Sequence, residues 1–303
     1  MRTVVVVAMV LGLAASARAQ TPSRTPWGDP DLQGLWNNAT VAPMERPAML
    51  AKKPFWTEAE AVDVEKNGMQ TLLKAVAAEV AVSGELNETW LEAGKMLRNR
   101  NTSMVIDPPD GRIPYTPDGK KRWDAQPTLG KRLTADSPEE RALIERCIQV
   151  DPVLLPNPFY NNNHQIVQAP GYVMILSEVI HQARIIPLTS RPRAGGPVTP
   201  WFGDPRGHWE GQTLVVETTN FREDGLFRGA TAALRLEERF TRVDAKTIDY
   251  ELKVTDPATF TQPWTAISTL RATAGPLFEY GCHEGNYSLP GILRGARVEE
   301  KDR

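Results

Sequence analysis

The chain of 303 residues is poor in cysteine and histidine and has no excess of either charge. Only two cysteines and four histidines occur, and 35 basic residues nearly balance 37 acidic ones. A near-neutral chain without a basic stripe excludes a surface built to follow nucleic acid phosphates. Beyond the N-terminal segment, no stretch approaches the roughly 20 apolar residues that a membrane-spanning helix needs. We therefore expect no nucleic acid partner and no stable membrane insertion.

The N-terminal segment has the pattern of a secretory signal peptide. Arg2 precedes an apolar run over 4–15, and Ala17 and Ala19 supply the small residues of a cleavage site. The run is too short to span a bilayer comfortably, although a retained N-terminal anchor is the alternative. We predict that 1–19 is a signal peptide and that the mature protein is secreted or periplasmic.

Export would place the two cysteines, Cys147 and Cys282, in an oxidising compartment. We predict a disulfide between them, with two buried free thiols as the alternative. The bridge would close a long loop, for which the chain-entropy model gives about 4–5 kcal/mol of stabilisation. It would also tie a helical segment to the turn that carries His283.

The content of 25 prolines and 22 glycines favours many turns over a helical bundle. In the C-terminal half, apolar and polar residues alternate with period two, most clearly over Thr247–Val254. A turn over Val243–Lys246 joins this strand to one over Leu234–Arg242. Further strands are expected at 165–168, 172–178, 183–188, 213–219, 265–273 and 277–280. Sequential short strands indicate an antiparallel meander, and closing it into a barrel removes the exposed edges.

Gly34-Leu35-Trp36 is expected to begin the first strand. A Gly-x-Trp at this place, with an arginine on a late strand such as Arg271, resembles the lipocalin and wider calycin pattern. An ordinary aromatic residue in a strand is the alternative. The expected fold is mainly β, an antiparallel meander closing into a calycin-like barrel.

Residues at about 40–160 differ in composition and predict a helix-and-loop insertion packed on the barrel. One helix is expected over Thr57–Ala81, where Thr57 and Glu60 have the capping-box spacing. A second is expected through Arg141–Val150, opened by the proline and acidic residues before it. We predict that 20–303 is a single β-barrel domain containing this insertion.

Five stretches of the sequence resemble a large family of exported bacterial proteins. They are PWGDPDLQG at Pro26–Gly34, DPPDGR at Asp107–Arg112, IHQARI at Ile180–Ile185, GHWEG at Gly207–Gly211 and CHEGNY at Cys282–Tyr287. The resemblance covers nearly all of the mature chain and implies export and one integrated fold. It implies no particular activity. The chain departs from the family pattern at Gln182 and at His164, which makes His164 the weakest site candidate.

The four histidines, His164, His181, His208 and His283, stand in polar, turn-like stretches. Histidine titrates near neutrality and is the commonest metal ligand, so several of them converging would make a site. Scattered over the surface, they would be ordinary polar residues. We predict that His181, His208 and His283 converge at the mouth of the barrel.

Neighbouring charged residues extend this predicted site. Arg184 follows His181 near a strand end, where a guanidinium suits a substrate carboxylate or an oxyanion. Gly285 permits a tight turn that presents His283 and Glu284 together. A structural ion pair and a structural turn are the respective alternatives. The predicted catalytic residues are His181, His208, His283 and Glu284, and Arg184 is a predicted substrate contact.

Four charged or titratable residues occur at every second position: Asp204, Arg206, His208 and Glu210. An extended segment would therefore project all four side chains to one side. A solvated face is the alternative interpretation. The proline and glycine between them favour an edge strand or a loop over a central strand. Arg206 is predicted to bind negative charge on a substrate.

Glu238 falls on the inward face of Leu234–Arg242. A buried carboxylate must be paired or protonated, and either state suits acid/base chemistry or substrate binding. The alternative is an ion pair with an inward arginine such as Arg271. Glu238 and Asn220 complete the predicted substrate contacts.

The sequence does not identify a cofactor. A divalent metal held by His181, His208 and His283 fits the ligand types, but their long spacing matches no metal-binding signature. No His-Glu-x-x-His, Gly-x-Ser-x-Gly or phosphate-binding glycine loop is present.

Three kinds of function therefore compete. The first is an exported hydrolase or lyase that uses acid/base or metal-assisted chemistry on a small or sugar-like molecule. The second is a calycin-like protein that binds a small molecule without catalysis, and the third is a structural envelope protein. Titratable groups in excess of what orienting a ligand needs favour the enzyme. The substrate, the reaction type and the oligomeric state are not indicated by the sequence.

Overall fold

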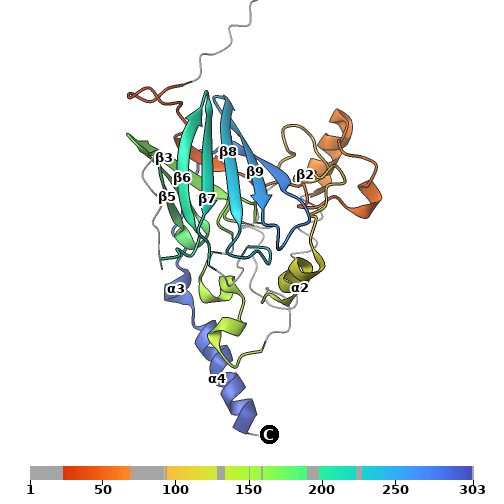
Figure 1. Ribbon diagram of the computed structural model, residues 1–303, viewed down its shortest axis with the longest axis vertical. Helices are drawn as coiled ribbons and strands as arrows, with labels where there is room; N and C mark the ends of the chain where they lie inside the picture. Colours follow the sequence, from red (N-terminus) through yellow and green to blue (C-terminus); the bar gives the residue numbers. More distant parts are fainter. Residues whose placement is uncertain are drawn as a thin grey trace, which may run out of the picture.

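The computed structural model describes residues 23–68, 70, 92, 94–127, 134–149, 151–157, 160–189, 198–222 and 227–301. The predicted signal peptide lies outside these residues. No helix in the described ranges is long and apolar enough to cross a membrane. The fold is mainly β, as predicted, and it ends in a helix that projects from one end of the sheet (Figure 1).

Ten strands form one antiparallel sheet in the described part of the chain, and its path runs β5-β4-β3-β1-β10-β9-β8-β7-β6. The short strand β2 pairs with β10 beside this path. The strands are β1 (Gly34–Asn37), β2 (Val105–Asp107), β3 (Asn163–Ala169), β4 (Tyr172–Ser177), β5 (Ala183–Pro187), β6 (Asp204–Glu210), β7 (Thr213–Thr219), β8 (Arg235–Asp244), β9 (Thr247–Thr255) and β10 (Trp264–Ala272).

The sheet curls until its two edge strands, β5 and β6, lie side by side. Each antiparallel step reverses the strand direction, so the first and last of nine strands on the path run the same way. In the described residues β5 and β6 meet through side chains instead of a ladder. A Cβ added at Gly207 of β6 would lie 3.0 Å from the side chain of Ile186 in β5. The barrel is therefore nearly closed.

The two ends of the barrel differ. β5 and β6 begin at one end, where β4 and β7 finish, and we call this the lower end (Figure 1). The tight turns at Gly171 and Gly211 lie at the upper end, and both glycines have positive φ. The short helix α3 (Cys282–Gly285) and the terminal helix α4 (Ser288–Lys301) lie at the lower end.

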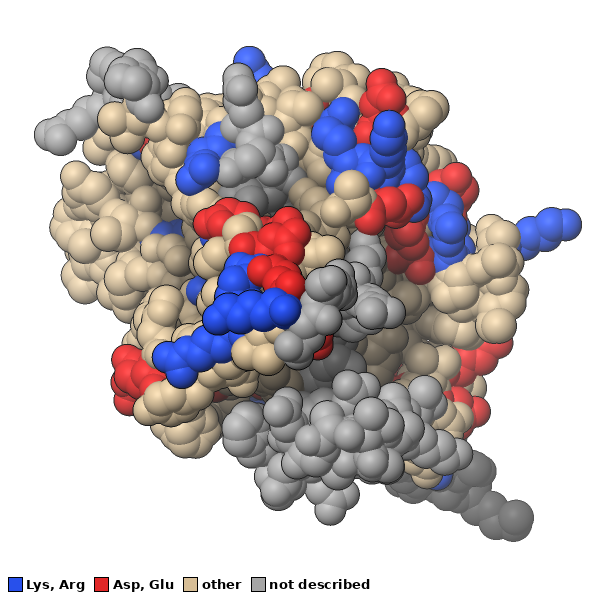
Figure 2. Space-filling view, turned by 90° about the horizontal axis from the view of Figure 1, so that it is seen from below, with Lys and Arg blue, Asp and Glu red and all other residues tan. Residues whose placement is uncertain are grey.

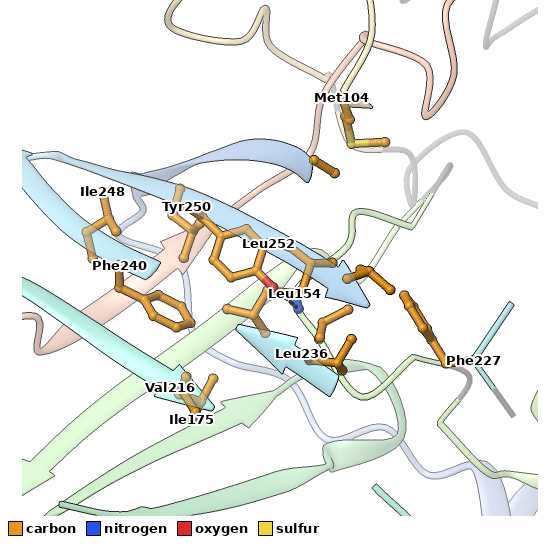
Figure 3. Close-up of a cluster of buried hydrophobic side chains, with 14 of the residues drawn as sticks. Met104, Leu154, Ile175, Val216, Phe227, Leu236, Phe240, Ile248, Tyr250 and Leu252 are labelled. Atoms are coloured by element: carbon orange, nitrogen blue, oxygen red, sulfur yellow. Dashed lines mark hydrogen bonds between the residues drawn. The ribbon is translucent and has the colours of Figure 1, made fainter. Parts of the chain in front are cut away.

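Large apolar side chains fill the interior of the barrel. Trp36, Trp264 and Phe240 are fully buried, and Tyr250 packs against Phe240 with ring centroids 5.0 Å apart (Figure 3). The backbone N–H of Leu154 donates to the Tyr250 hydroxyl, so the chain entering β3 is anchored to the core. The alternating pattern of β8 and β9 supplies this inner face, because strand side chains point alternately to opposite sides.

Part of the predicted insertion at 40–160 crosses the outer face of β9 and β10. The backbone N–H of Arg98 donates to the Thr269 hydroxyl, and the Ile267 N–H donates to the Met104 carbonyl. The insertion also contains α2 (Pro117–Ala125) and the 3-10 turns η1 (Ala48–Leu50), η3 (Pro138–Glu140) and η4 (Leu143–Arg146).

Two predicted elements are wrong. Residues 277–280 form no strand, because both sides of β10 are already paired, with β9 and with β1. The helix expected through Arg141–Val150 is only the 3-10 turn η4, since Cys147 takes a left-handed φ of 57° and ends it. The predicted capping box does form: the Glu60 carboxylate accepts from the Thr57 N–H, and a helix starts at residue 58. The part of that predicted helix beyond residue 70 lies outside the described residues.

The arginine that packs on Trp36 is Arg242 of β8. Its guanidinium lies 5.4 Å from the ring centroid and donates to the Asp31 carbonyl. Arg271, expected in this position, instead donates to the Met96 carbonyl on the outer segment. The Gly-x-Trp stretch thus begins β1 as predicted, but its arginine comes from β8 and not from β10.

Candidate functional site

His181 lies at the lower end of the barrel, in the corner between β4 and β5. This corner is the 3-10 turn η5 (Val179–His181), and two of its residues have positive φ, Ile180 at 55° and His181 at 42°. A β-branched residue rarely adopts this conformation, and such strain gathers at functional sites. Ile180 is buried while His181 is exposed, so the corner anchors one side chain and presents the other.

The orientation of His181 is set by a backbone carbonyl. Its Nδ1 lies 3.1 Å from the carbonyl oxygen of Tyr280. A carbonyl only accepts, so Nδ1 carries the proton in this bond and Nε2 of the neutral ring keeps a free lone pair. The Nε2 atom is therefore available to take a proton or to bind a ligand.

His283 reaches the same corner through the predicted disulfide. Cys147 and Cys282 are bridged, with 135 residues of sequence separation between them. The bridge joins α3 to the end of η4, and the Asn286 side chain adds a hydrogen bond to the Glu145 carbonyl. The residue directly after the bridged Cys282 is His283, so its backbone is held on both sides.

These two elements bring two of the predicted histidines together. The ring centroids of His181 and His283 lie 6.5 Å apart, with the ring planes inclined at 58°. Both side chains are exposed. We call them the histidine pair. It joins residues 102 positions apart, a proximity that the sequence could only suggest.

Several aromatic residues lie near His283 in the sequence. Burial raises the pKa of the Tyr280 phenol, and the neighbouring Tyr160 adds to this effect. Phe278 and Tyr287, on either side of His283 in the chain, are 65% and 82% exposed. Acidic and basic side chains lie interspersed over this end of the molecule (Figure 2). Two exposed aromatic side chains thus lie near His283 in the sequence.

Glu284 lies beside His283 in α3, and its side chain reaches back toward Gly281. Its carboxylate oxygen lies 3.8 Å from the position of a Cβ built on Gly281. The side chain is exposed. The structure therefore places Glu284 next to the histidine pair in the chain without a contact to either ring among the described interactions.

His208 is not brought to the histidine pair. It projects from the outer face of β6 near the upper end, where its Nε2 lies 3.2 Å from Glu210. Glu210 also binds Arg239 of β8. The alternating residues of β6 do share one face, as expected, but that face carries a surface network of charges.

Arg206 and Asn220 lie on the lower half of β6 and just beyond β7. Arg206 binds the Asp204 carboxylate and the Pro205 carbonyl. Asn220 has a φ of 62° and donates to the Val198 carbonyl. Neither residue contacts the histidine pair in the described structure.

Arg184 and Glu238 meet inside the barrel. The Glu238 side chain is fully buried, and both of its oxygens accept from the Arg184 guanidinium. The Tyr250 hydroxyl donates to the same carboxylate at 2.9 Å. Burial disfavours the charged guanidinium, but the Glu238 carboxylate outweighs it and raises the pKa of Arg184. The partner of Glu238 is thus Arg184 and not Arg271.

His164 is also part of this interior. Its two ring nitrogens lie 3.0 Å from the Ser177 hydroxyl and 3.2 Å from the Asn38 side-chain oxygen. Burial, together with a smaller effect of the nearby Arg184 charge, lowers the pKa of His164 to about 3. His164 is thus a neutral, buried histidine with both ring nitrogens bonded, and it belongs to the core of the barrel.

A second feature, which sequence reasoning missed, is a cavity of about 320 Å³ on the outer face of the sheet. The segment after residue 96 covers it, and its lining includes Arg98, Arg239, Asp249, Glu251, Ile106 and Ile267. The alternating charges of β8 and β9 could have indicated a polar outer face. The covering segment could not be placed from the sequence, because its contacts to the sheet span more than a hundred residues.

The described residues contain no group of three or more histidine, cysteine, aspartate or glutamate side chains placed to hold one metal ion. The trio of His181, His208 and His283 is therefore not assembled. Comparison of the sequence with protein-family models and with curated proteins finds no match.

Proposed function

We propose that the protein is an exported enzyme that performs acid/base hydrolysis or elimination at the histidine pair. The substrate class is a small or sugar-like molecule with an apolar part and little net charge. The observation that carries this proposal is the meeting of His181 and His283, each held by a different covalent or backbone restraint.

The two imidazoles have distinguishable roles. His181 donates Nδ1–H to the Tyr280 carbonyl, so its Nε2 acts as the general base. His283 then serves as the general acid that protonates the leaving group. Imidazoles suit both tasks because they exchange protons near neutral pH. A substrate bound between rings 6.5 Å apart would contact both without a large movement.

Export is part of this proposal. The Cys147–Cys282 bridge supports it, since disulfides persist in oxidising compartments. We expect the full chain, expressed in a bacterium, to appear in the periplasmic fraction with Gln20 as its first residue. Recovery of the intact chain from the cytoplasm with Met1 in place would contradict export.

The enzyme proposal is tested with chromogenic esters, phosphoesters, glycosides and β-eliminating uronates as substrates. His181→Ala and His283→Ala should each lower kcat/KM by about 10²–10⁴-fold, the contribution of one general acid or base. His208→Ala is the matched control, because it removes an exposed histidine at the other end of the barrel. Loss of turnover in the control alone would refute the assignment, and so would undiminished turnover in both pair variants.

A second candidate function is small-molecule binding at the outer cavity. Its volume of about 320 Å³ falls at the small end of ligand pockets. Ile106 and Ile267 offer apolar contacts, while Arg98 is already paired with Asp249. Glu251→Gln should weaken any ligand that bears an amine, whereas His181→Ala should not. The two functions are thus separable by one pair of variants.

A further inference from the structure

We propose that the histidine pair binds a single late first-row divalent metal ion, with Cu²⁺ preferred over Zn²⁺. This inference rests on the same site as the proposed function, and the ion would occupy ring nitrogens that the metal-free protein uses for proton transfer. It replaces the three-histidine arrangement, which the described structure does not form. The ion would have two imidazole ligands, and solvent would complete its coordination.

The first argument is the hydrogen bond at His181 Nδ1. Histidines that bind metals nearly always donate their other ring N–H to a carbonyl or carboxylate, which fixes the tautomer and directs the free nitrogen at the ion. His181 makes this bond to the Tyr280 carbonyl at 3.1 Å. The strained corner at Ile180 and His181 holds the ring in that place. His181 Nε2 is thus the ring nitrogen left free to bind an ion.

The second argument is the distance between the rings. Zinc binds imidazole nitrogen at about 2.0–2.1 Å, which places the centroids of two rings on one ion roughly 5–6 Å apart. The observed separation is 6.5 Å. His283 is exposed and its side chain makes no hydrogen bond within the described residues, so the ring is free to turn toward an ion shared with His181. The disulfide keeps its backbone in reach.

The choice of ion follows from the donors. Two neutral imidazoles select late transition metals, and affinity rises toward Cu²⁺ and falls again at Zn²⁺. Magnesium and calcium prefer several oxygen ligands. The Glu284 carboxylate is not a third ligand, because no three such side chains in the described residues are placed to hold one ion. Because only two protein ligands bind, the ion should exchange readily and leave coordination positions open for water or substrate.

The test is isothermal titration of tag-free, chelator-treated full-length protein with CuCl₂, ZnCl₂ and MgCl₂ at pH 7. We expect one Cu²⁺ per chain, weaker Zn²⁺ and no Mg²⁺ binding. Deleting either ligand, in His181→Ala or His283→Ala, should weaken Cu²⁺ by more than the roughly 10–100-fold that a lost supporting hydrogen bond costs. His208→Ala and Glu284→Gln should retain the wild-type affinity.

Absence of Cu²⁺ binding, or equal binding in both pair variants, would overturn the metal site. Loss of binding in His208→Ala would also overturn it and place the ion at the β6 surface. The proposed acid/base function is judged separately, by turnover of metal-free protein. Turnover without Cu²⁺ binding would support the acid/base function and reject the metal site. Cu²⁺ binding without turnover would support the metal site and reject the acid/base function.

Discussion

The residues with the largest energetic consequences are the charged groups inside the barrel. Glu238 and Arg184 are both removed from solvent and bind one another through two hydrogen bonds. A buried pair of this kind adds little net stability, but removing one partner leaves the other charge without compensation. The sequence identified Glu238 as inward-facing and hence as either paired or reactive. The structure assigns it to a pair.

Glu238→Ala should therefore lower the free energy of unfolding by about 3–5 kcal/mol, because Arg184 is left charged and buried. The control is Glu237→Ala, at the preceding position on the opposite face of β8. This change should alter the free energy of unfolding by less than about 1 kcal/mol. Urea denaturation measures both. The double variant Arg184→Met with Glu238→Leu should recover most of the loss. An equal effect of the two single alanine variants would contradict the buried pair.

His164 links stability to pH. Its pKa is lowered to about 3 in the folded protein by burial, below the value near 6.5 of an exposed histidine. The unfolded chain therefore binds the extra proton first, and stability falls as pH decreases from about 6.5 toward 3. Between pH 6 and pH 4 the loss should reach about 2–3 kcal/mol. Urea unfolding at several pH values measures it.

The control for this pH effect is His164→Gln, which keeps a polar side chain without the titration. The difference in unfolding free energy between the two proteins should shrink as the pH falls, since only the wild type carries this penalty. A difference that stays constant from pH 7 to pH 4 would show that His164 is not protonated on unfolding.

At the scale of elements, α3 is too short to hold itself in place. It has four residues and none of them is buried. Its position depends on the Cys147–Cys282 bridge and on Asn286, which binds the Glu145 carbonyl. The segment that carries His283 is therefore positioned by η4, an element far away in the sequence.

The double variant Cys147→Ser with Cys282→Ser should lower the free energy of unfolding by about 4–5 kcal/mol in the chain-entropy model. Hydrogen exchange followed by mass spectrometry should show faster exchange at 282–288 than in the wild type, because α3 loses its covalent anchor. Unchanged exchange in this segment, with or without a loss of stability, would mean that the bridge does not position His283.

Elements with a regular pattern were predictable, and those that depend on a partner were not. The period-two alternation of 247–254 identified β9 because both of its faces have a fixed environment. Residues 277–280 have strand-like composition but find no unpaired strand next to β10. The turn η4 stops after four residues because Cys147 is held in a left-handed conformation at its end. Strand pairing and the position of a disulfide-bonded residue both depend on the tertiary structure.

On the scale of the whole molecule, the number of strands determines where the barrel opens. Nine strands on an antiparallel path cannot close without one parallel neighbour pair, and β5 and β6 occupy that position. At their facing edges the Ile186 side chain of β5 packs against Gly207 of β6. The histidine pair lies at the lower end beside this seam, since η5, which ends at His181, leads into β5 through one residue.

Backbone opening should follow this architecture. Amides of β8, β9 and β10, which have neighbours on both sides, should exchange slowest. Those of β5 and β6 should show opening free energies roughly 1–2 kcal/mol smaller, because each has an unpaired edge. Hydrogen exchange with peptide-level resolution measures this order. Equal protection of β5 and β9 would indicate a ladder that closes the seam.

The sequence by itself determined the mainly β class, the outward and inward faces of the long strands, and the pairing of its two cysteines. These follow from local periodicity and from there being only one other cysteine to bond. Which histidines meet was decided by the tertiary structure alone. Convergence depends on strand order, on the corner at η5 and on a covalent tie across 135 residues. The same fold that joined His181 to His283 carried His208 to the other end and enclosed His164.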